Sequence, residues 1–445
     1  MAESTRKKIV IVGGGFGGVY AALELDQWLF RHPDVDVTIV NRDNFFLFTP
    51  MLHEVAASDL DITNIVSPVR KLVSNVEFFD GNVEKLDLHS RTVTVSHGDG
   101  HVHDLSFDHL VLAPGSVTNF YGLPGLEERA ITMKSLGDAI TLRNLLIQQL
   151  EEAETECGAP DRDHLMTFVV AGGGFAGVET IAGMNDFVHR ALPFYPHISP
   201  EKVRMILVHP GEVILPELSE KLGRYAERKL ADRGIEIRKK TKVAAVGGRS
   251  VTLSDGSVIE ASTLVWTAGT QPNPLIRTLP CKTEKGRVCV DETLQVPGWP
   301  GVWALGDCAL IPDPITGGFH PPTAQHAIRQ GRVLARNILA SLRGQPARPF
   351  RFRTIGQLAS LGRRTGVAQI FGLRFSGFVA WWMWRTIYLM KLPRLEKRLR
   401  VALDWPWDLV FSKDLLKFLS RRRDVISHAE SPVQKEMGEA MARAS

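Results

Sequence analysis

The hydrophobic pattern of the chain begins with two short apolar runs on either side of a longer segment of helical period. The runs lie in KKIVIV (7–12) and VDVTIV (35–40), and their near-continuous apolar character predicts strands buried on both faces, as in a parallel sheet. Residues 19–30 carry apolar side chains at helical spacing. The same order recurs about 159 residues later, over residues 165–208. The pattern therefore predicts an α/β fold with two Rossmann-like units.

A glycine-rich loop joins the first strand to the helix in each unit. The two loops are Gly13-x-Gly15-x-x-Gly18 and Gly172-x-Gly174-x-x-Gly177. Their first glycine permits a tight turn, their second lets a pyrophosphate approach the backbone, and their third lets helix and strand pack closely. The helix N-terminus then presents free N–H groups and a partial positive charge to phosphates. One such loop means little, but two copies in the same context predict two dinucleotide sites.

Two further stretches are short apolar strands that end in a glycine turn. They are FDHLVLAPGS (107–116) and VWALGDCA (302–309), and the second places Asp307 where a carboxylate can bond a ribityl hydroxyl. With them the chain resembles the flavoproteins that carry two dinucleotide-binding domains. The resemblance implies that the first loop binds FAD and the second binds NAD(P)H. It also implies a discontinuous FAD domain, residues 1–120 and 285–342, with the NAD(P)H domain inserted at 121–284.

Three stretches narrow the resemblance to one family. NFFLFTPMLHEVA (44–56), PPTAQHAIRQG (321–331) and RVALDWPWDLVF (400–411) resemble type II NADH:quinone oxidoreductases, and the likeness extends over about residues 7–425. The resemblance implies a flavoenzyme that passes a hydride from NADH to FAD and then two electrons to a membrane quinone. It implies no proton pumping, because no run of 18 uncharged apolar residues is present to span a bilayer.

The resemblance also implies two sets of binding residues. The FAD set is Gly13, Gly15, Phe16, Gly17, Gly18, Asn41, Arg42, Pro50, Ala113, Gly115, Asp307, Ala324 and Gln325. The NADH set is Gly172, Gly174, Phe175, Gly177, Glu179, His209, Ala268 and Gly269. Asn41 and His209 stand where the family commonly has acidic residues for a ribose. A neutral imidazole can bond a 2′-hydroxyl, so we expect NADH rather than NADPH.

Three residues are expected to act in catalysis. Gln325 and Arg329 lie four positions apart, on one face of a helix that Thr323 is expected to cap. The resemblance places the start of this helix against the flavin and makes Gln325 part of the quinone pocket, with Arg329 where the family has a second Gln. The alternative for Arg329 is that it lies on a solvated face of the helix. The resemblance places Glu179 between nicotinamide and flavin, where it also complements the helix dipole.

The C-terminal fifth of the chain differs from the rest in charge. Residues 343–423 contain 18 Lys and Arg against 4 Asp and Glu, whereas the remainder holds 35 basic and 45 acidic residues. Residues 374–391 and 408–420 are expected to form apolar or amphipathic helices, with the basic segment 391–400 between them. Aromatic faces beside Lys and Arg are typical of helices that lie in a membrane interface. We therefore expect residues 343–425 to anchor the protein to an anionic membrane surface through residues 374–420.

Three tryptophans in residues 381–384 carry most of this expectation. Burying roughly 150 Å² on each at about 25 cal/mol/Å² would contribute on the order of 10 kcal/mol before ordering costs. The alternative is that Trp381, Trp382 and Trp384 pack in a homodimer interface or against the FAD domain. The expected location is the cytoplasmic face of the cell membrane, with a polar, disordered tail at 426–445. No recognised nucleic-acid-binding fold accompanies the positive charge.

Cysteine and histidine usage limits the alternatives. The four cysteines have no CxxC spacing, which indicates a reducing compartment and no dithiol centre, and no metal site is expected among the fourteen histidines. A sulfide:quinone reductase would need a cysteine pair near the flavin, where only Cys308 is expected. A soluble ferredoxin or rubredoxin reductase would not need the basic aromatic segment. A non-catalytic flavoprotein acting as a redox sensor or membrane scaffold would differ by showing no turnover.

Overall fold

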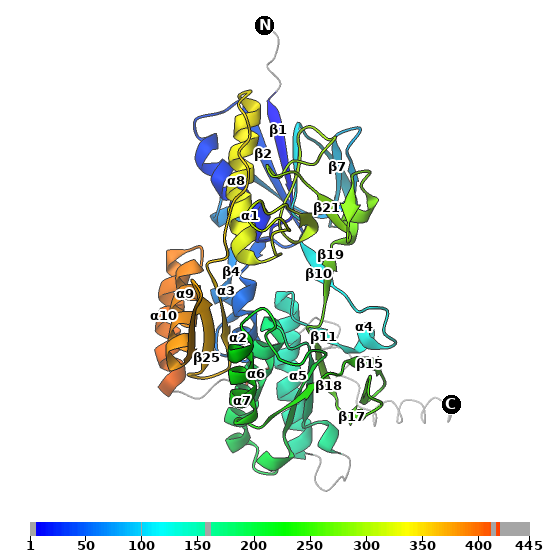
Figure 1. The fold of residues 1–445 in the computed structure, drawn as a ribbon, viewed down its shortest axis with the longest axis vertical. Helices are drawn as coiled ribbons and strands as arrows, with labels where there is room; N and C mark the ends of the chain where they lie inside the picture. Colours follow the sequence, from blue (N-terminus) through cyan, green and yellow to red (C-terminus); the bar gives the residue numbers. More distant parts are fainter. Residues whose placement is uncertain (1–5, 99, 156–161, 411–414, 419–445) are drawn as a thin grey trace, which may run out of the picture.

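Two α/β units lie one above the other along the long axis of the molecule, and a smaller C-terminal domain lies beside them (Figure 1). The computed structural model describes residues 6–98, 100–155, 162–410 and 415–418. The expected disordered tail at 426–445 and Cys157 lie outside these residues.

The first unit is built on a five-stranded parallel sheet. Its strand order is β22 (Val302–Ala304), β9 (His109–Leu112), β1 (Lys7–Val12), β2 (Val35–Asn41) and β5 (Glu77–Asp80). Ile9 pairs with Val37 on one side and with His109 on the other, so β1 is central and its apolar residues are buried on both faces. Helices α1 (Phe16–Leu29) and α8 (Ala324–Leu342) pack against each other beside the sheet. The sheet thus takes strands from both ends of the chain.

The second unit repeats the arrangement with its own parallel sheet. Its order is β11 (Ile131–Thr132), β18 (Thr263–Trp266), β12 (Thr167–Ala171), β13 (Arg204–His209) and β14 (Ile235–Lys239). The helices of this unit are α4 (Leu126–Arg129), α5 (Leu136–Thr155), α6 (Phe175–Ala191) and α7 (Glu220–Ala231). Each glycine loop therefore connects a central strand to the helix that follows it, as the sequence pattern predicts.

Short sheets complete both units and connect them, and their pairings are antiparallel except that of β21 with β23. The first unit carries β3 (Phe45–Leu47) with β4 (Val66–Pro68), β6 (Asn82–Asp87) with β7 (Thr92–His97) and β8 (His101–Ser106), and β20 (Thr283–Glu284), β21 (Arg287–Cys289) and β23 (Ala309–Leu310). The second carries β15 (Val243–Val246), β16 (Ser250–Leu253) and β17 (Val258–Glu260). The chain crosses between the units at β10 (Ser116–Thr118) and β19 (Thr270–Pro272), which pair with each other.

The C-terminal domain contains helices, as the sequence predicts, and also an antiparallel sheet that the sequence does not predict. It consists of an antiparallel sheet, β24 (Gly356–Ser360), β25 (Gly366–Ile370) and β26 (Leu373–Gly377), followed by α9 (Phe378–Lys391) and α10 (Leu395–Val410). Residues 374–377 are therefore strand, and the basic segment 391–400 forms most of the first half of α10. Of the helix expected at 408–420, residues 408–410 belong to α10 and residues 415–418 have no regular structure, and the other residues lie outside the described part of the chain.

Two short helices of the first unit contact the other two parts of the structure. Helix α2 (Leu52–Ala56) packs against α5 and α6, and α3 (Ile62–Ile65) packs against α10. The Lys397 ammonium donates to the Thr63 carbonyl at 2.5 Å, and the Asn64 amide donates to the Asp404 carboxylate at 2.5 Å. Within the described part of the chain, no helix has the length and apolar character needed to cross a bilayer.

Candidate functional site

A single large cavity of about 970 Å³ runs between the two units and reaches the C-terminal domain. Both glycine loops contribute to its walls, through Gly15 and Phe16 on one side and Phe175 on the other. Leu358 of β24 and Tyr388 of α9 close it at the C-terminal domain. Its volume is at the upper end of the range for cofactor and ligand pockets. The cavity therefore joins all three parts of the structure.

The first glycine loop has the geometry that close contact with a pyrophosphate requires. Gly13 has φ +108°, and a methyl group there would overlap the Ala113 carbonyl oxygen. A methyl group at Gly18 would overlap the carbonyl oxygen of Gly13. Gly15, by contrast, faces open space in the cavity. The tight turn, the open approach and the close helix packing thus lie where the pattern predicts them, and the loop fits a dinucleotide.

The second loop repeats this geometry. Gly172 has φ +115°, and a methyl group at Gly177 would overlap the Gly172 carbonyl oxygen. Thr267 supports the turn by donating its hydroxyl to the carbonyl oxygen of Ala171 at 2.9 Å. The second unit therefore offers an equivalent dinucleotide cradle, which faces the same cavity through Phe175 and Ala176.

The predicted site residues divide into those that line the cavity and those that support it. The cavity is lined by Gly15, Phe16, Gly17, Asn41, Arg42, Pro50, Ala113, Gly115, Phe175, Glu179, Gly269, Asp307 and Ala324. The supporting group is Gly13, Gly18, Gly172, Gly174, Gly177, His209, Ala268, Gln325 and Arg329, which are not among the lining residues.

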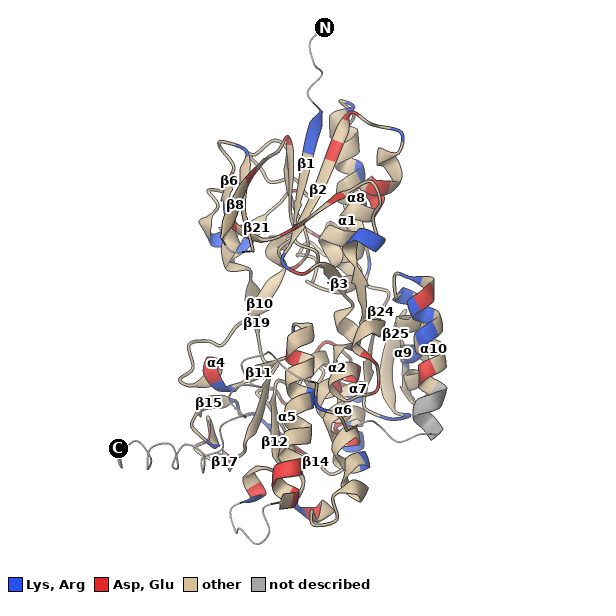
Figure 2. Cartoon of the chain, turned by 180° about the vertical axis from the view of Figure 1, so that it is seen from behind, with Lys and Arg blue, Asp and Glu red and all other residues tan. Residues whose placement is uncertain are grey.

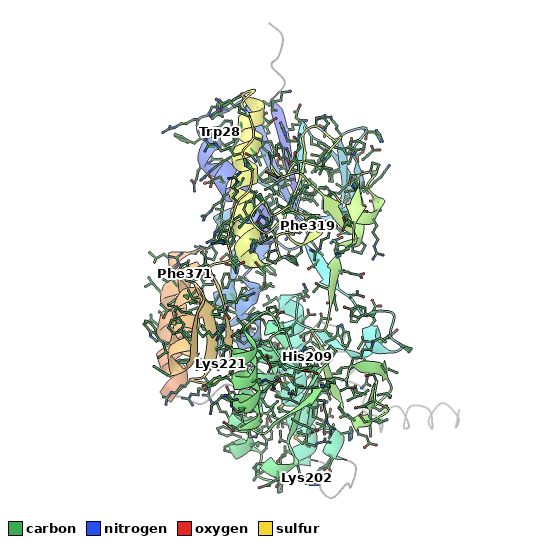
Figure 3. All side chains as sticks on the ribbon, viewed as in Figure 1. Trp28, Lys202, His209, Lys221, Phe319 and Phe371 are labelled. Carbon is green, nitrogen blue, oxygen red and sulfur yellow. The ribbon has the colours of Figure 1, made fainter. Side chains whose placement is uncertain are left out.

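Asn41 and His209 play the same structural part in the two units. The Oδ1 atom of Asn41 accepts from the Gly14 N–H at 2.8 Å, and the Nδ1 atom of His209 accepts from the Gly173 N–H at 3.2 Å. The Nε2–H of His209 donates to the Val213 carbonyl at 3.0 Å (labelled in Figure 3). Both ring nitrogens are therefore engaged by the backbone. The ribose contact expected from His209 would require one of these bonds to break.

Asp307 lies at the cavity wall in a small polar group. Its Oδ2 atom accepts from the Ser116 hydroxyl at 2.7 Å, and that hydroxyl accepts from the Lys134 ammonium at 3.0 Å. Burial lowers the pKa of Lys134, and the nearby Asp307 carboxylate opposes this shift. Lys134 and Ser116 line the same cavity. Ser116 ends the stretch FDHLVLAPGS, but Lys134 belongs to no motif, so the sequence gives no signal that these three side chains meet.

Gln325 and Arg329 do not reach the cavity. The Gln325 amide group donates to the Gly356 carbonyl at 3.2 Å and accepts from the Ile355 N–H at 3.4 Å, so it fastens α8 to the C-terminal domain. The Arg329 guanidinium lies 4.1 Å from the centre of the Phe352 ring and donates to the Gln325 carbonyl at 2.8 Å. Arg329 is thus neither a solvated residue nor a cavity residue. It covers an aromatic ring beside the site.

Comparison with known proteins identifies the family. The pyridine nucleotide-disulphide oxidoreductase model matches residues 7–331, and the NDH2 C-terminal domain model matches residues 355–414. The type II NADH:quinone oxidoreductase Ndh of Mycobacterium tuberculosis is 33% identical over 434 residues, which cover 94% of this chain and 89% of that relative. The chain belongs to the type II NADH:quinone oxidoreductases. The resemblance found in the sequence is thereby confirmed.

Other type II NADH:quinone oxidoreductases and related flavoproteins share the fold. Demethylphylloquinone reductase NdbB of Synechocystis sp. is 32% identical over 90% of this chain and 96% of its own. The solved structure of NDH2 from Plasmodium falciparum in complex with NADH gives a TM-score of 0.86 at 19% identity, covering 93% of this chain and all of that one. The sulfide:quinone oxidoreductase of Aquifex aeolicus gives 0.67 at 19% identity, covering 89% and 92%. At these identities the structures show a common fold alone.

Glu179 occupies the wall between the cavity and the C-terminal domain. Its Oε1 atom accepts from the Trp384 indole N–H at 2.9 Å and from the Ser360 N–H at 3.0 Å. Burial raises the pKa of Glu179 to about 8, the two hydrogen bonds lower it, and Glu54 raises it further. The carboxyl group therefore carries a proton at neutral pH. Trp384 was expected to bind lipid, and its contact with Glu179 has no sequence signal.

Two other residues beside Glu179 were missed. Tyr388 lines the cavity, its ring packs edge-on against Phe48 and Trp384, and burial raises the pKa of its phenol. His53 lies in the family stretch at 44–56, and its Nδ1 atom is 3.8 Å from Oε2 of Glu179. The stretch identifies the family but does not reveal which of its side chains face the site.

The cysteines argue against the sulfide:quinone alternative. Cys308 is fully buried, and burial raises the pKa of its thiol to about 12, so it remains an unreactive thiol. Cys281, Cys289 and Cys308 are all free, and no cysteine lines the large cavity within the described chain.

Three histidines, His97, His101 and His103, share one face of the β7–β8 hairpin. Among described residues, no group of three or more His, Cys, Asp or Glu side chains could hold a metal ion.

The second loop predicts a preference for NADH over NADPH. Oε1 of Glu217 lies 3.5 Å from the place a Cβ at Gly174 would take, and burial lowers the pKa of His209, which stays neutral at pH 7. A 2′-phosphate would meet a carboxylate there with no cation from His209. We expect kcat/KM for NADH to exceed that for NADPH by about tenfold or more, an energy difference of about 1.4 kcal/mol.

A charge reversal tests this preference. Glu217→Arg is expected to raise kcat/KM for NADPH and so lower the ratio of kcat/KM for NADH to that for NADPH. The reason is that the new guanidinium attracts the 2′-phosphate that the carboxylate repels. Glu260→Arg, at an exposed position on β17, is the control and should leave the ratio unchanged. An unaltered ratio in Glu217→Arg would show that this carboxylate does not face the ribose.

Proposed function

We propose that the protein is a peripheral membrane NADH:quinone oxidoreductase that holds FAD in the first unit and binds NADH in the second. In this assignment residues 1–120 and 285–342 form the FAD domain, 121–284 the NADH domain, and 343–425 the membrane-facing domain. The observation that carries the proposal is the single cavity, which both glycine loops and the C-terminal domain share. A donor and an acceptor can therefore reach one cofactor from two directions.

The residues of the chain supply position and electrostatics. When bound, FAD accepts a hydride and passes on two electrons. Gly15 and the N-terminus of α1 would hold its pyrophosphate, and Asp307 would bond its ribityl chain. The N-terminus of α8, beginning at Ala324, lies at the cavity and would favour negative charge there. Glu179 holds a proton beside the same space.

The C-terminal domain supports a membrane partner through α9 and α10. Leu395, Leu399 and Leu403 are exposed at four-residue spacing on one face of α10, while Phe378 and Trp382 are exposed on α9. Arg398 and Arg400 stand on either side of Leu399 in α10, and Arg400 is exposed; basic residues colour much of this helix blue in Figure 2. Phe371, at the turn before β26, is 81% exposed (Figure 3). Exposed apolar residues beside basic ones are suited to the surface of an anionic bilayer. We assign this contact to the cytoplasmic face of the membrane. It would bring the protein to the bilayer in which a lipid-borne quinone is dissolved.

The proposed function predicts two spectroscopic results. The purified full-length protein should be yellow, and NADH should bleach it under anaerobic conditions, because a hydride acceptor lies beside the second loop. A short-chain ubiquinone or menaquinone analogue, added without oxygen, should then restore the colour. Absorbance in a sealed stopped-flow instrument checks both steps. A colourless protein, or bleached protein that no quinone reoxidises, would refute the proposal.

A further inference from the structure

A second, smaller cavity of about 40 Å³ lies behind Glu179, on the side away from the dinucleotide loops. At about 10–15 Å³ per molecule, it has room for about three or four waters. Its walls come from α2 and the turn after it, from α6, from the β24–β25 turn and from α9. It is distinct from the large cavity, and the proposed hydride transfer makes no use of it.

Only two residues line both cavities, and they are His53 and Glu179. Together they form the partition between the cofactor space and the small cavity. Both side chains are buried, with His53 8% exposed. A proton that moves between the small cavity and the large one must therefore pass this pair.

The geometry of the pair suits proton transfer. Because Oε1 of Glu179 accepts two hydrogen bonds, we expect the carboxyl proton on Oε2, which faces Nδ1 of His53 at 3.8 Å. The two atoms need to approach by about 1 Å to form a hydrogen bond. One nitrogen of the ring thus faces the acid, while the other, Nε2, is buried and has no hydrogen-bond partner among the described residues.

The small cavity is unusually rich in charge. Its acids are Glu54, Asp59, Glu179 and Asp186. Its bases are Arg190, Arg363 and Arg385. Arg363 is exposed, and the side chains of Asp59 and Arg190 are 22% and 25% exposed, so this end of the cavity reaches solvent. Helix α5, which also packs on α2, contributes Arg143 as its buried charged residue.

We propose that His53 is a proton-relay residue that carries protons from water in the small cavity to Glu179. This inference rests on the proposed function, in which NADH, a proton and a quinone give NAD⁺ and quinol. The hydride brings two electrons and one hydrogen nucleus, so the second hydrogen of the quinol comes from water. Glu179 gives up its carboxyl proton towards the large cavity. His53 then hands it a replacement from one ring nitrogen, and the ring takes a proton at the other when water from the small cavity moves within reach of that nitrogen.

The protonation states agree with this order. Burial lowers the pKa of His53 to about 4, with Asp59 opposing the shift, so the ring is neutral at pH 7 and can accept a proton. Glu179, with its pKa near 8, is loaded at pH 7. As the pH rises through about 8, Glu179 loses its proton, and quinone reduction should slow.

Infrared spectroscopy of the full-length holoenzyme, with NAD⁺ bound to fill the large cavity, tests the route without turnover. After transfer to D₂O, the carbonyl band of the protonated Glu179 shifts as its proton exchanges. The band is identified by its loss in Glu179→Gln. We expect exchange to be at least tenfold slower in His53→Gln than in the parent protein. His53→Phe keeps the ring that packs edge-on against Trp384 and should show the same slowing.

His109→Gln is the matched control. His109 is also 8% exposed, burial also lowers its pKa to about 4, and it also lies beside a tryptophan, Trp303, but it lines neither cavity. Unaltered exchange in both His53 variants, or equal slowing in His109→Gln, would overturn the relay.

Turnover gives a second, independent measurement. In His53→Gln we expect quinone reduction at pH 7 to fall about tenfold or more and NADH–ferricyanide activity to fall much less, because ferricyanide accepts electrons without protons. An equal loss with both acceptors would overturn the relay, since His53 would then serve the NADH site or the fold. Failure of the parent protein to reduce any quinone would instead refute the proposed function, and it would leave the infrared result standing.

Discussion

Gly18→Ala is expected to yield a protein purified without flavin, whereas Gly177→Ala is expected to remain yellow and lose its response to NADH. In both variants the new methyl group would overlap a carbonyl oxygen of its own loop, that of Gly13 or of Gly172. The loop would have to open, and the helix N-terminus would lose its place beside the pyrophosphate. Because each unit holds its own nucleotide, the two losses should be separate.

Absorbance spectra and NADH titrations distinguish the two variants. Gly177→Ala should resist bleaching at NADH concentrations about a hundredfold above those that bleach the parent protein, while dithionite still reduces it. Gly248→Ala is the control, since a methyl group there would meet nothing within 4 Å. A yellow Gly18→Ala protein, or a colourless Gly177→Ala protein, would contradict the assignment of FAD to the first loop.

The second large effect is expected at Trp384. Its side chain is fully buried in the same core as Val401 and Trp405, and its indole N–H donates to Glu179. Trp384→Ala should lower the free energy of unfolding by about 3–5 kcal/mol, because it leaves a large cavity in the core. It should also impair turnover, since one hydrogen bond to Glu179 is lost. Thermal unfolding and the rate of quinone reduction by NADH at pH 7 measure the two effects.

Trp382→Ala is the matched comparison, two positions away on the same helix. Trp382 is 57% exposed, so the substitution should change the free energy of unfolding by less than about 0.5 kcal/mol. It should instead weaken sedimentation with vesicles that contain anionic lipid. Equal destabilisation by the two substitutions would contradict this separation of core and membrane residues. For the same reason, deletion of residues 370–445 should damage the fold as well as release the protein from membranes.

The sequence predicts the two α/β units well because their signals are local. Continuous apolar strands such as KKIVIV are buried on both faces, and a loop that begins with Gly13 can turn tightly only with glycine there. The order of strands across each sheet is not local, but the return of VWALGDCA to the first sheet follows from its likeness to FDHLVLAPGS. These features depend on backbone geometry, which the residue types constrain directly.

The C-terminal expectations failed in part for a physical reason. Burial in a bilayer and burial in a protein core both select apolar side chains, so the run of tryptophans cannot distinguish the two environments. Trp381 and Trp384 are in the core, and Trp382 alone of the three is well exposed. The three strands between 356 and 377 were missed for a related reason. These strands pair only with one another, and the sequence alone does not show which segments pair.

The roles of single side chains were the least predictable. Gln325 and Arg329 stand in a family motif, but which way each side chain points depends on Phe352 and on the Ile355–Gly356 backbone, about thirty residues away. His209 was expected to bind a ribose, yet its two ring nitrogens form hydrogen bonds with the backbone of Gly173 and Val213. Such contacts form only when distant segments meet.

The paired strands β10 and β19 connect the two units, and so does the packing of α2 against α5 and α6. A further connection runs through the C-terminal domain, and together these connections form a closed frame. Gln325 links the first unit to β24, and the Ser360 N–H at the end of β24 binds Glu179 of the second unit. A frame joined on both sides resists the clamshell motion that a single hinge would allow. Dinucleotides would then enter between two units whose separation changes little. The distance between electron donor and acceptor would stay nearly constant during turnover.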